Sequence, residues 1–308
     1  MSTTKPANTR LRHLDGVVLV MLSTIAWGSG GLFIRLLPFD MWTIIFWGGV
    51  FGTAFIGTYV LWRFGRTTSK TIMGAAGILI TLYSTAATTL FAPALQNTSV
   101  ANGMTIYAAL PFFTAAIAWL WLREHPSMLT LTASAVAMAG IAIMLGPTSG
   151  GPRLGDLLAM LATAATALMT VAIRRSRHVE MLPVAGLSTA LSALVASPLA
   201  EHLFDLTARD FLVAAGFGLM TSALGLTLYV IASAMIPSTL AALIATMEAP
   251  IGALWAWIGV GEVPAPATFV GGAIVLASVF GRLLLEPRTE ERPEDSRRAE
   301  CVRSPFDN

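Results

Sequence analysis

The side chain best suited to chemistry is Glu248, which lies well inside a long apolar stretch, whereas every other charged residue lies within a few positions of a polar connection. A carboxyl group near the middle of a bilayer costs roughly 2.5–3.5 kcal/mol on insertion scales, so it generally faces a cavity or the interior of a helix bundle. Three roles are open for Glu248. It could couple proton movement, bind the amine of a solute, or form a structural hydrogen bond between helices.

Two prolines, Pro111 and Pro250, also fall near the middle of apolar stretches. Inside a helix, a proline removes the backbone hydrogen bond to a carbonyl about four residues earlier, which here would free carbonyls near Tyr107 and Thr246. Free polar backbone at membrane depth is tolerated only where it is buried in protein or lines water. The prolines therefore predict helix kinks that line a cavity, although kinks that only shape the packing are an equal alternative.

Other polar and amphipathic side chains lie inside apolar stretches rather than at their ends, and some of them must line any solute pathway. For each one, a hydrogen bond to a neighbouring helix is the commoner role. Asn102 and Thr105 are three residues apart and would share one helix face. The candidates for the pathway, besides Glu248, are Trp27, Ser29, Tyr83, Ser84, Asn102, Tyr107, Thr166, Thr170, Ser222, Tyr229 and Thr246.

The elements that must position these residues follow from composition. Hydrophobic residues make up 55% of the 308 positions and charged residues 12%, which is too little polar material to cover a soluble domain. A membrane-spanning helix needs about 20 apolar residues, and such stretches follow one another along the chain. We predict an all-α integral membrane protein with ten transmembrane helices, near residues 15–34, 41–62, 72–93, 99–122, 129–146, 154–173, 182–200, 211–235, 238–260 and 265–284.

The basic residues predict the orientation of these helices. With the N-terminus in the cytoplasm, only three of the 19 Lys and Arg residues fall on the outer side, namely Arg35, Arg153 and Arg209. Basic residues close to span ends are enriched in cytoplasmic loops. We therefore predict a multi-pass protein with both termini in the cytoplasm.

The two halves of the chain resemble each other at a shift of 139 residues, which places Arg35 on Arg174 and Pro111 on Pro250. With one residue of slippage, Glu124 falls on Glu262. Five is an odd number of spans, so the second half would be inverted relative to the first, an arrangement typical of secondary transporters with a central cavity. The predicted parts are an N-terminal cytoplasmic segment 1–13, two five-helix repeats 14–146 and 147–285, and a disordered cytoplasmic tail 286–308.

These motifs together resemble the EamA module of the drug/metabolite transporter superfamily over about residues 14–284. Many members carry an arginine in the second span, where this chain has Ile45-Phe46-Trp47-Gly48-Gly49. Within the superfamily, the sequence is most similar to bacterial amino-acid exporters of the aromatic type. The resemblance is carried by Trp27-Gly28-Ser29, Ala94-Leu95-Gln96-Asn97-Thr98-Ser99, Pro111, Trp121-Leu122-Arg123-Glu124 and Gly140-Ile141, and then by Ser238, Met247-Glu248-Ala249-Pro250, Gly261-Glu262 and Gly271-Gly272.

The resemblance implies a secondary transporter in the bacterial inner membrane that exports amino acids, neutral and aromatic ones first, by alternating access. Its expected partners are these amino acids and membrane lipid, and the expected state is a monomer, with a dimer as the alternative. Export of other small metabolites or drugs, and a channel-like facilitator, are the alternative functions. Proton coupling and facilitated diffusion both remain open.

Several other function classes lack their sequence signals. The four histidines lie in predicted loops, no HExxH motif occurs, and Cys301 is the single cysteine, so we expect neither an enzyme nor a metal site. No G-x-x-x-x-G-K motif is present, so we expect no ATP-driven step within this chain and no cofactor. A net charge of +2 with dispersed basic residues gives no reason to expect nucleic-acid binding.

Overall fold

The computed structural model describes residues 6–64, 74–98, 100–146, 154–176 and 179–285, and all regular elements within them are helices. Nine helices in these ranges are long and apolar enough to cross a membrane by length and composition. The 16-residue helix Met181–Ala196 is apolar but shorter. The predicted all-helical membrane protein is therefore confirmed. The predicted count of ten transmembrane helices depends on whether this shorter helix also crosses the membrane. The predicted disordered tail, 286–308, lies outside the described residues.

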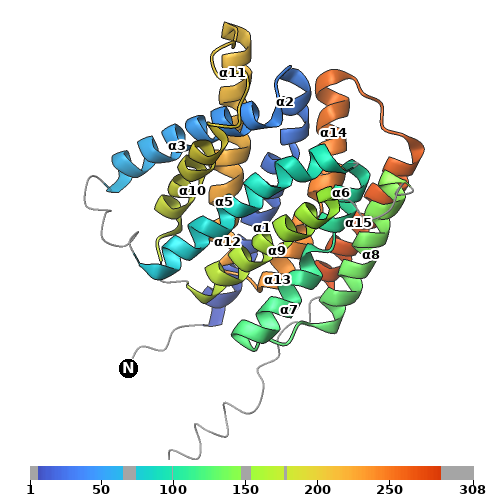
Figure 1. The fold of residues 1–308 in the computed structure, drawn as a ribbon. Helices are drawn as coiled ribbons and strands as arrows, with labels where there is room; N and C mark the ends of the chain where they lie inside the picture. Colours follow the sequence, from blue (N-terminus) through green and yellow to red (C-terminus); the bar gives the residue numbers. More distant parts are fainter. Residues whose placement is uncertain (1–5, 65–73, 99, 147–153, 177–178, 286–308) are drawn as a thin grey trace, which may run out of the picture.

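Within the described ranges, the first half of the chain has seven helical segments for its five predicted spans, because the first and fourth spans are each interrupted (Figure 1). The segments are α1 (Pro6–Gly28), α2 (Gly30–Leu36), α3 (Met41–Phe64), α5 (Ala75–Asn97), α6 (Val100–Tyr107), α7 (Leu110–Leu122) and α8 (Met128–Leu145).

The second half is interrupted in its eighth and ninth predicted spans. Its segments are α9 (Leu154–Arg175), α10 (Met181–Ala196), α11 (Ala208–Phe217), the π-helical segment η2 (Gly218–Gly225), α12 (Leu226–Ser233), α13 (Ser238–Ala245), α14 (Glu248–Val260) and α15 (Pro266–Leu284).

Two predicted spans differ from the helices in ways that local chemistry explains. The predicted helix 15–34 is broken at Ser29, which is flanked by Gly28 and Gly30, and glycine has a low helix propensity. The predicted helix 182–200 ends at Ala196. Ser197 still has helical backbone angles, but Pro198 has no backbone N–H for the carbonyl four residues earlier, so the helix stops there.

The fourth and ninth spans are interrupted close to the two central prolines. Pro111 occupies the second position of α7, and the chain between α6 and α7 is Ala108-Ala109. Pro250 occupies the third position of α14, after a break at Thr246-Met247. A proline is tolerated in the first turn of a helix, where its missing N–H has no intrahelical partner, so each proline begins a new helical segment.

Close pairs of helices join the two halves: α3 packs against α10, α5 against α9, and α8 against α15. The last pair lies side by side on the right of Figure 1. A Cβ added at Gly271 would collide with the carbonyl oxygen of Gly140 and lie 2.7 Å from the Met144 nitrogen. Small residues allow such close backbone approach, which in a membrane is a main source of helix association.

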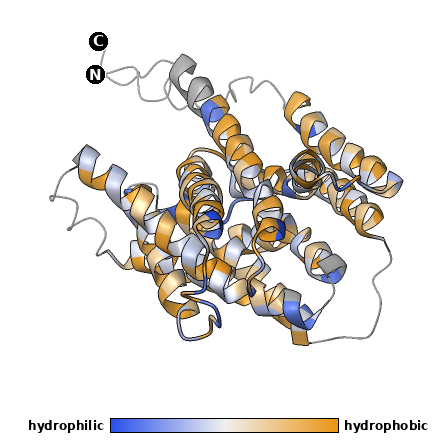
Figure 2. Ribbon diagram, turned by 90° about the horizontal axis from the view of Figure 1, so that it is seen from above, coloured by the Kyte–Doolittle hydropathy of each residue, from blue (hydrophilic) through white to orange (hydrophobic). Residues whose placement is uncertain are grey.

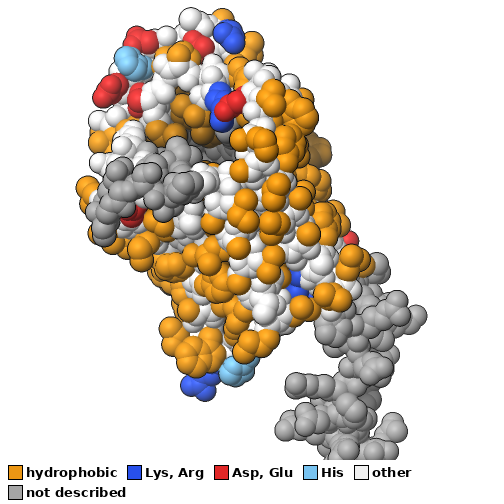
Figure 3. Space-filling view, turned by 90° about the vertical axis from the view of Figure 1, so that its right-hand side faces the viewer, with side chains coloured by type: hydrophobic (Ala, Val, Ile, Leu, Met, Phe, Trp, Pro, Cys, Tyr) orange, Lys and Arg blue, Asp and Glu red, His pale blue; other side chains and the backbone are white. Residues whose placement is uncertain are grey.

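The surface has the pattern of a protein surrounded by lipid. Figure 3 shows apolar side chains over the middle of the molecule, while charged side chains gather toward its two ends. Figure 2 shows apolar residues around the outward faces of the helices. Large exposed apolar side chains such as Trp62, Leu120 and Ile258 lie on these helices. We name the two ends by residues: the Arg35 end, where α2 finishes at the top of Figure 1, and the Arg174 end, where α7 and α9 finish.

Candidate functional site

Two cavities meet inside the bundle at the break between α13 and α14. The first has a volume of about 340 Å³ and the second about 520 Å³. Five residues line both of them: Trp27, Gly31, Met104, Tyr107 and Glu248. The junction is thus formed by α1, α2, α6 and the first residue of α14, elements from both halves of the chain.

Glu248 is placed at this junction by the interruption of the ninth span. It is the first residue of α14, so its carboxyl group belongs to the first turn of a helix, where the helix dipole favours negative charge. Among the described residues, no hydrogen bond involves this carboxyl group. Tyr107, the last residue of α6, lines the same two cavities. Glu248 is partly buried, and a carboxyl group at a cavity without a protein donor is available to a solute or to water.

The first cavity is apolar with a set of hydroxyl groups. Its aromatic walls are Trp27, Phe91, Tyr107 and Phe217. Among its described lining residues, Glu248 is the only Asp, Glu, Lys, Arg or His. Apolar surface with a few placed polar groups is the usual character of a small-molecule site. The hydroxyl groups come from Ser84, Thr88, Thr166, Ser188, Thr189, Ser192, Thr221 and Ser222.

Trp27 is a fixed wall of both cavities. Its indole N–H donates to the carbonyl of Thr221 in η2 at 3.0 Å. Its ring lies 4.8 Å from that of Tyr229, and the Tyr229 hydroxyl is 2.9 Å from the Thr170 hydroxyl. A Cβ at Gly225 would collide with the Trp27 ring, so the glycine is needed for this approach. The π-helical segment therefore docks the first span against the eighth, and such segments frequently occur at functional sites.

Five of the predicted pathway residues, Thr170 among them, lie outside the linings of both cavities. Ser29 donates to the Ala26 carbonyl at 2.6 Å, and Asn102 donates to Asp156 at 3.4 Å. Tyr229 is fully buried against Thr170, and Tyr83 packs against the apolar core. These five are placed as packing or hydrogen-bonding groups. The residues that do line a cavity are Glu248, Trp27, Ser84, Tyr107, Thr166, Ser222 and Thr246.

Sequence reasoning missed several hydroxyl groups of the first cavity. Ser188, Thr189 and Ser192 come from α10, and Thr221 comes from η2. They lie inside predicted spans, so the same criterion that selected Thr166 and Ser222 would have found them. Ser188 and Ser192 each donate to a carbonyl four residues earlier in α10, at 2.8 and 2.9 Å. Their side chains are thereby held at the cavity wall.

Both cavities extend toward the Arg35 end. The second is lined there by Arg35 and Glu262, and the first by Ile34 and Met41. Figure 3 shows a hollow in this part of the surface, beside a neighbouring basic and acidic side chain. The Arg174 end instead carries contacts between α7, α9 and α12. This conformation is therefore open toward the Arg35 end.

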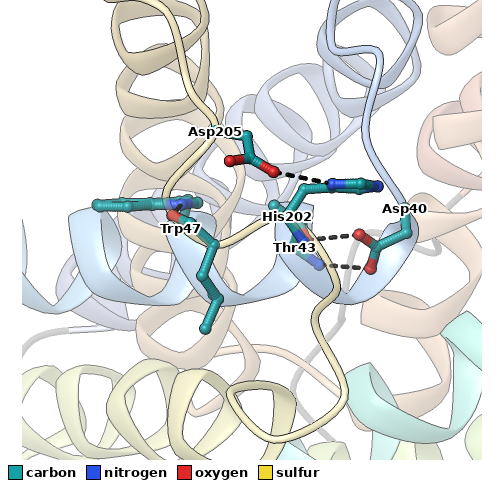
Figure 4. Close-up of polar contacts among 6 residues, drawn as sticks. Asp40, Thr43, Trp47, His202 and Asp205 are labelled. Atoms are coloured by element: carbon teal, nitrogen blue, oxygen red, sulfur yellow. Dashed lines mark hydrogen bonds and ion pairs between the residues drawn. The ribbon is translucent and has the colours of Figure 1, made fainter.

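The connection between α10 and α11 is held on the first turn of α3 at the Arg35 end (Figure 4). Asp40 accepts hydrogen bonds from the Thr43 hydroxyl at 2.5 Å and from the Thr43 backbone N–H at 2.9 Å. Partial burial opposes ionisation of Asp40, but these hydrogen bonds outweigh it and lower the pKa of its carboxyl group. The Trp47 indole donates to Leu203, and His202 lies 3.1 Å from Asp205.

Interrupted helices around a partly buried carboxyl group, in an apolar bundle built from two halves, are typical of helical membrane transporters. The family model described as "EamA-like transporter family" matches residues 14–146 and 153–284. The chain belongs to the EamA-like transporter family, within the drug/metabolite transporter superfamily. It is accordingly a multi-pass membrane protein of a family that transports small molecules, and members of this family are transporters rather than enzymes.

The solved structures include 29 matching chains. One of them, titled "Crystal structure of protein", has a TM-score of 0.67 and 16% sequence identity, with 93% of this chain and 100% of that chain covered. This similarity shows a shared fold. A search of the curated proteins finds no match. The predicted family is confirmed, while the amino-acid exporter subtype stays a prediction.

Proposed function

We propose that this protein is a secondary transporter that exports neutral and aromatic amino acids across a bacterial inner membrane by alternating access. The observation that carries the proposal is the single carboxyl group of Glu248 at the junction of two cavities with aromatic walls. An amino acid offers an ammonium group for Glu248 and an apolar side chain for Trp27 and Phe217. The hydroxyl groups of the first cavity supply further hydrogen bonds.

A site for the carboxylate of the same amino acid is available across the junction. The residue that corresponds to Glu248 in the first half is Ala109, which immediately precedes α7. The first turn of α7 has no acidic residue, so no side chain there neutralises the positive end of its dipole. Tyr107 and Ala108, which come just before Ala109, line the second cavity. One half-helix thus carries its own carboxyl group, and the other offers its N-terminus to an anion.

The contacts between spans support two halves related by inversion. The first span of each half packs against the third span of the other: α1 against η2 and α12, and α9 against α5. The second spans α3 and α10 pair with each other, as do the fifth spans α8 and α15. Exchanging the halves interchanges the first two contacts and maps the pairs α3–α10 and α8–α15 onto themselves. Symmetry of this kind lets one bundle open toward either side of the membrane.

The charge distribution supports cytoplasmic termini. Arg35 and Arg209 lie near the Arg35 end, whereas Arg123, Arg174 and Arg175 lie near the Arg174 end. By the positive-inside rule the Arg174 end is then cytoplasmic, and the two cavities of this conformation open outward. An opening confined to one end favours alternating access over a continuous channel.

Transport is tested with purified protein in liposomes loaded with radiolabelled phenylalanine, leucine or alanine. We expect the rate of efflux down the gradient to be well above the rate from loaded liposomes that contain no protein. Glu248→Gln should lower this efflux by about tenfold or more, because a hydrogen bond to a charged group is worth about 1.5–3 kcal/mol. Glu180→Gln is the matched control, since Glu180 is exposed before α10 and lines neither cavity.

The outcomes separate the roles of Glu248. If liposomes with the wild-type protein and liposomes without protein release every amino acid at the same rate, the substrate assignment is wrong. If Glu248→Gln loses only the response to a pH gradient and retains binding, the group couples proton movement and does not hold the amine. Efflux of organic cations without any efflux of amino acids would instead favour the alternative class of drugs and other metabolites.

A further inference from the structure

Two ion pairs occupy equivalent positions at opposite ends of the bundle. Nε of Arg35 lies 2.5 Å from Oε2 of Glu262, and Nε of Arg174 lies 3.6 Å from Oε1 of Glu124. The arginines finish the first spans of the two halves, and the glutamates follow the fourth spans. Each pair therefore joins one half of the chain to the other.

The two pairs have different surroundings. The Arg174 side chain is 13% exposed, and its Nη1 also donates to the Ala234 carbonyl at the end of α12, at 3.2 Å. The next residue, Arg175, donates to the Trp121 carbonyl at 3.1 Å and lies over the Trp121 ring. Three spans are thus tied together at this end, where neither cavity opens.

At the other end, the bonds of Arg35 to described residues do not reach a third span. The Arg35 side chain is 46% exposed, and its Nη1 donates to the Gly31 carbonyl of its own helix at 3.3 Å. Subtracting the repeat offset of 139 from Ala234 gives Leu95, near the C-terminal end of α5. Arg35 donates to no carbonyl of α5 among the described residues, and the second cavity reaches the surface beside it.

We propose that Arg35 and Arg174 are alternating latches, a proposal that rests on the alternating access proposed above. In this conformation Arg174 bridges Glu124 and the Ala234 carbonyl and closes its end. In the opposite conformation Arg35 bridges Glu262 and the Leu95 carbonyl, while Arg174 releases Ala234 and turns to its own helix. Both ion pairs persist throughout, and what alternates is the bond from each arginine to the third span.

The chemistry of arginine suits this role. Its guanidinium group has five donors in a planar fork, so one side chain can hold a carboxylate and a backbone carbonyl at the same time. A helix C-terminus presents carbonyls without intrahelical donors, which makes the ends of α5 and α12 suitable acceptors. The two arginines occupy equivalent places at opposite ends. Loss of Arg174 should therefore favour the conformation that is closed at the Arg35 end, and loss of Arg35 should favour the conformation that is closed at the Arg174 end.

The test measures thiol accessibility at the two ends in a Cys301→Ser background, in proteoliposomes with a membrane-impermeant maleimide supplied from each side. The reporters are Thr268→Cys, which lies in the lining of the second cavity, and Leu129→Cys, its equivalent in the other half. Arg174→Gln should lower the labelling rate at position 268 and raise it at position 129, so that their ratio falls at least about fivefold. Arg35→Gln should raise the same ratio.

Arg209→Gln is the control, because Arg209 is exposed in the first turn of α11 and should leave the ratio unchanged. Arg174→Lys should shift the ratio as Arg174→Gln does, since a lysine cannot reproduce the fork. Labelling ratios that move in the same direction for Arg35→Gln and Arg174→Gln, or do not move, overturn the latches. Reciprocal shifts without amino-acid efflux support the latches and reject only the proposed substrates.

Discussion

At the scale of the residue, the most informative comparison is between Glu248 and Ala109, which hold equivalent positions in the two halves. Each lies at the start of the second segment of an interrupted span. One half therefore places a carboxyl group at the junction of the cavities, and the other leaves a bare helix N-terminus there. The proposed amino-acid substrates are zwitterions, and this asymmetry is the reason for proposing them over simple cations or anions.

Asp40 gives a pH-dependent prediction at the same scale. The pKa of the Asp40 carboxyl group is lower in the folded protein than in the unfolded chain. Its stabilising effect is therefore fully present at pH values above the pKa of the unfolded chain, and it is lost as the pH falls through the pKa of the folded protein. Asp40→Ala should lower stability at neutral pH by about 0.5–2 kcal/mol, as loss of a helix N-cap does. Thermal unfolding in detergent, followed from neutral pH to about pH 3, should show this difference narrowing. A difference that widens in acid would contradict the assignment.

At the scale of the element, interruptions matter more than regular helix. The prolines begin new segments in the fourth and ninth spans, and the π-helical segment of the eighth span offers its Thr221 carbonyl to Trp27. These irregular places border the cavities, whereas the uninterrupted helices α8 and α15 line only the second one. Exposed backbone at membrane depth needs such a protected position.

The packing of α8 on α15 can be tested by substituting one glycine. Gly271→Ala places a methyl group against the Gly140 carbonyl, and overpacking of this kind typically costs about 1–3 kcal/mol. We expect a lower melting temperature in detergent. Gly281→Ala, on the same helix, meets nothing within 4 Å and should leave the melting temperature unchanged or slightly higher. Equal effects of both substitutions would show that the close approach is unimportant.

At the scale of the whole molecule, the two halves close around a cavity that neither half contains alone. The junction takes Trp27 and Tyr107 from one half and Glu248 from the other. The same helix pairs are in contact when the two halves are interchanged. The equivalent residues could therefore form an opening at the opposite end. Arg35 and Arg174, the two proposed latches, hold matching positions in the halves while their contacts differ.

The orientation of the molecule in the membrane gives a prediction at this scale. In intact cells, an impermeant thiol reagent should label Phe204→Cys, in the exposed connection before α11, but not His125→Cys, in the connection after α7. Both variants are made in a Cys301→Ser background, and permeabilised cells serve as the control because both positions should then react. Labelling of position 125 alone in intact cells would reverse the orientation and the assignment of the open side.

The sequence by itself determined the local features of this protein. Apolar length located the helices, prolines marked two of the interruptions, and the isolation of Glu248 identified a group that membrane burial makes costly. Arg35, Arg174, Glu124 and Glu262 were visible as a repeat but not as ion pairs. Each of these signals depends on residue type or on short spacing along one helix.

Only the tertiary structure decided which groups meet. The bond from Trp27 to Thr221 joins residues 194 positions apart, and it depends on a π-helical segment that has no sequence pattern in this chain. Tyr229 and Asn102 lie inside spans as Tyr107 does, yet their side chains are taken by Thr170 and Asp156. The apolar pattern of a transmembrane helix indicates well which residues lie within the membrane. It indicates poorly which helix face contacts lipid and which contacts other helices, because lipid and the bundle interior are similarly apolar. Which hydroxyl lines the cavity is therefore settled by packing between distant helices.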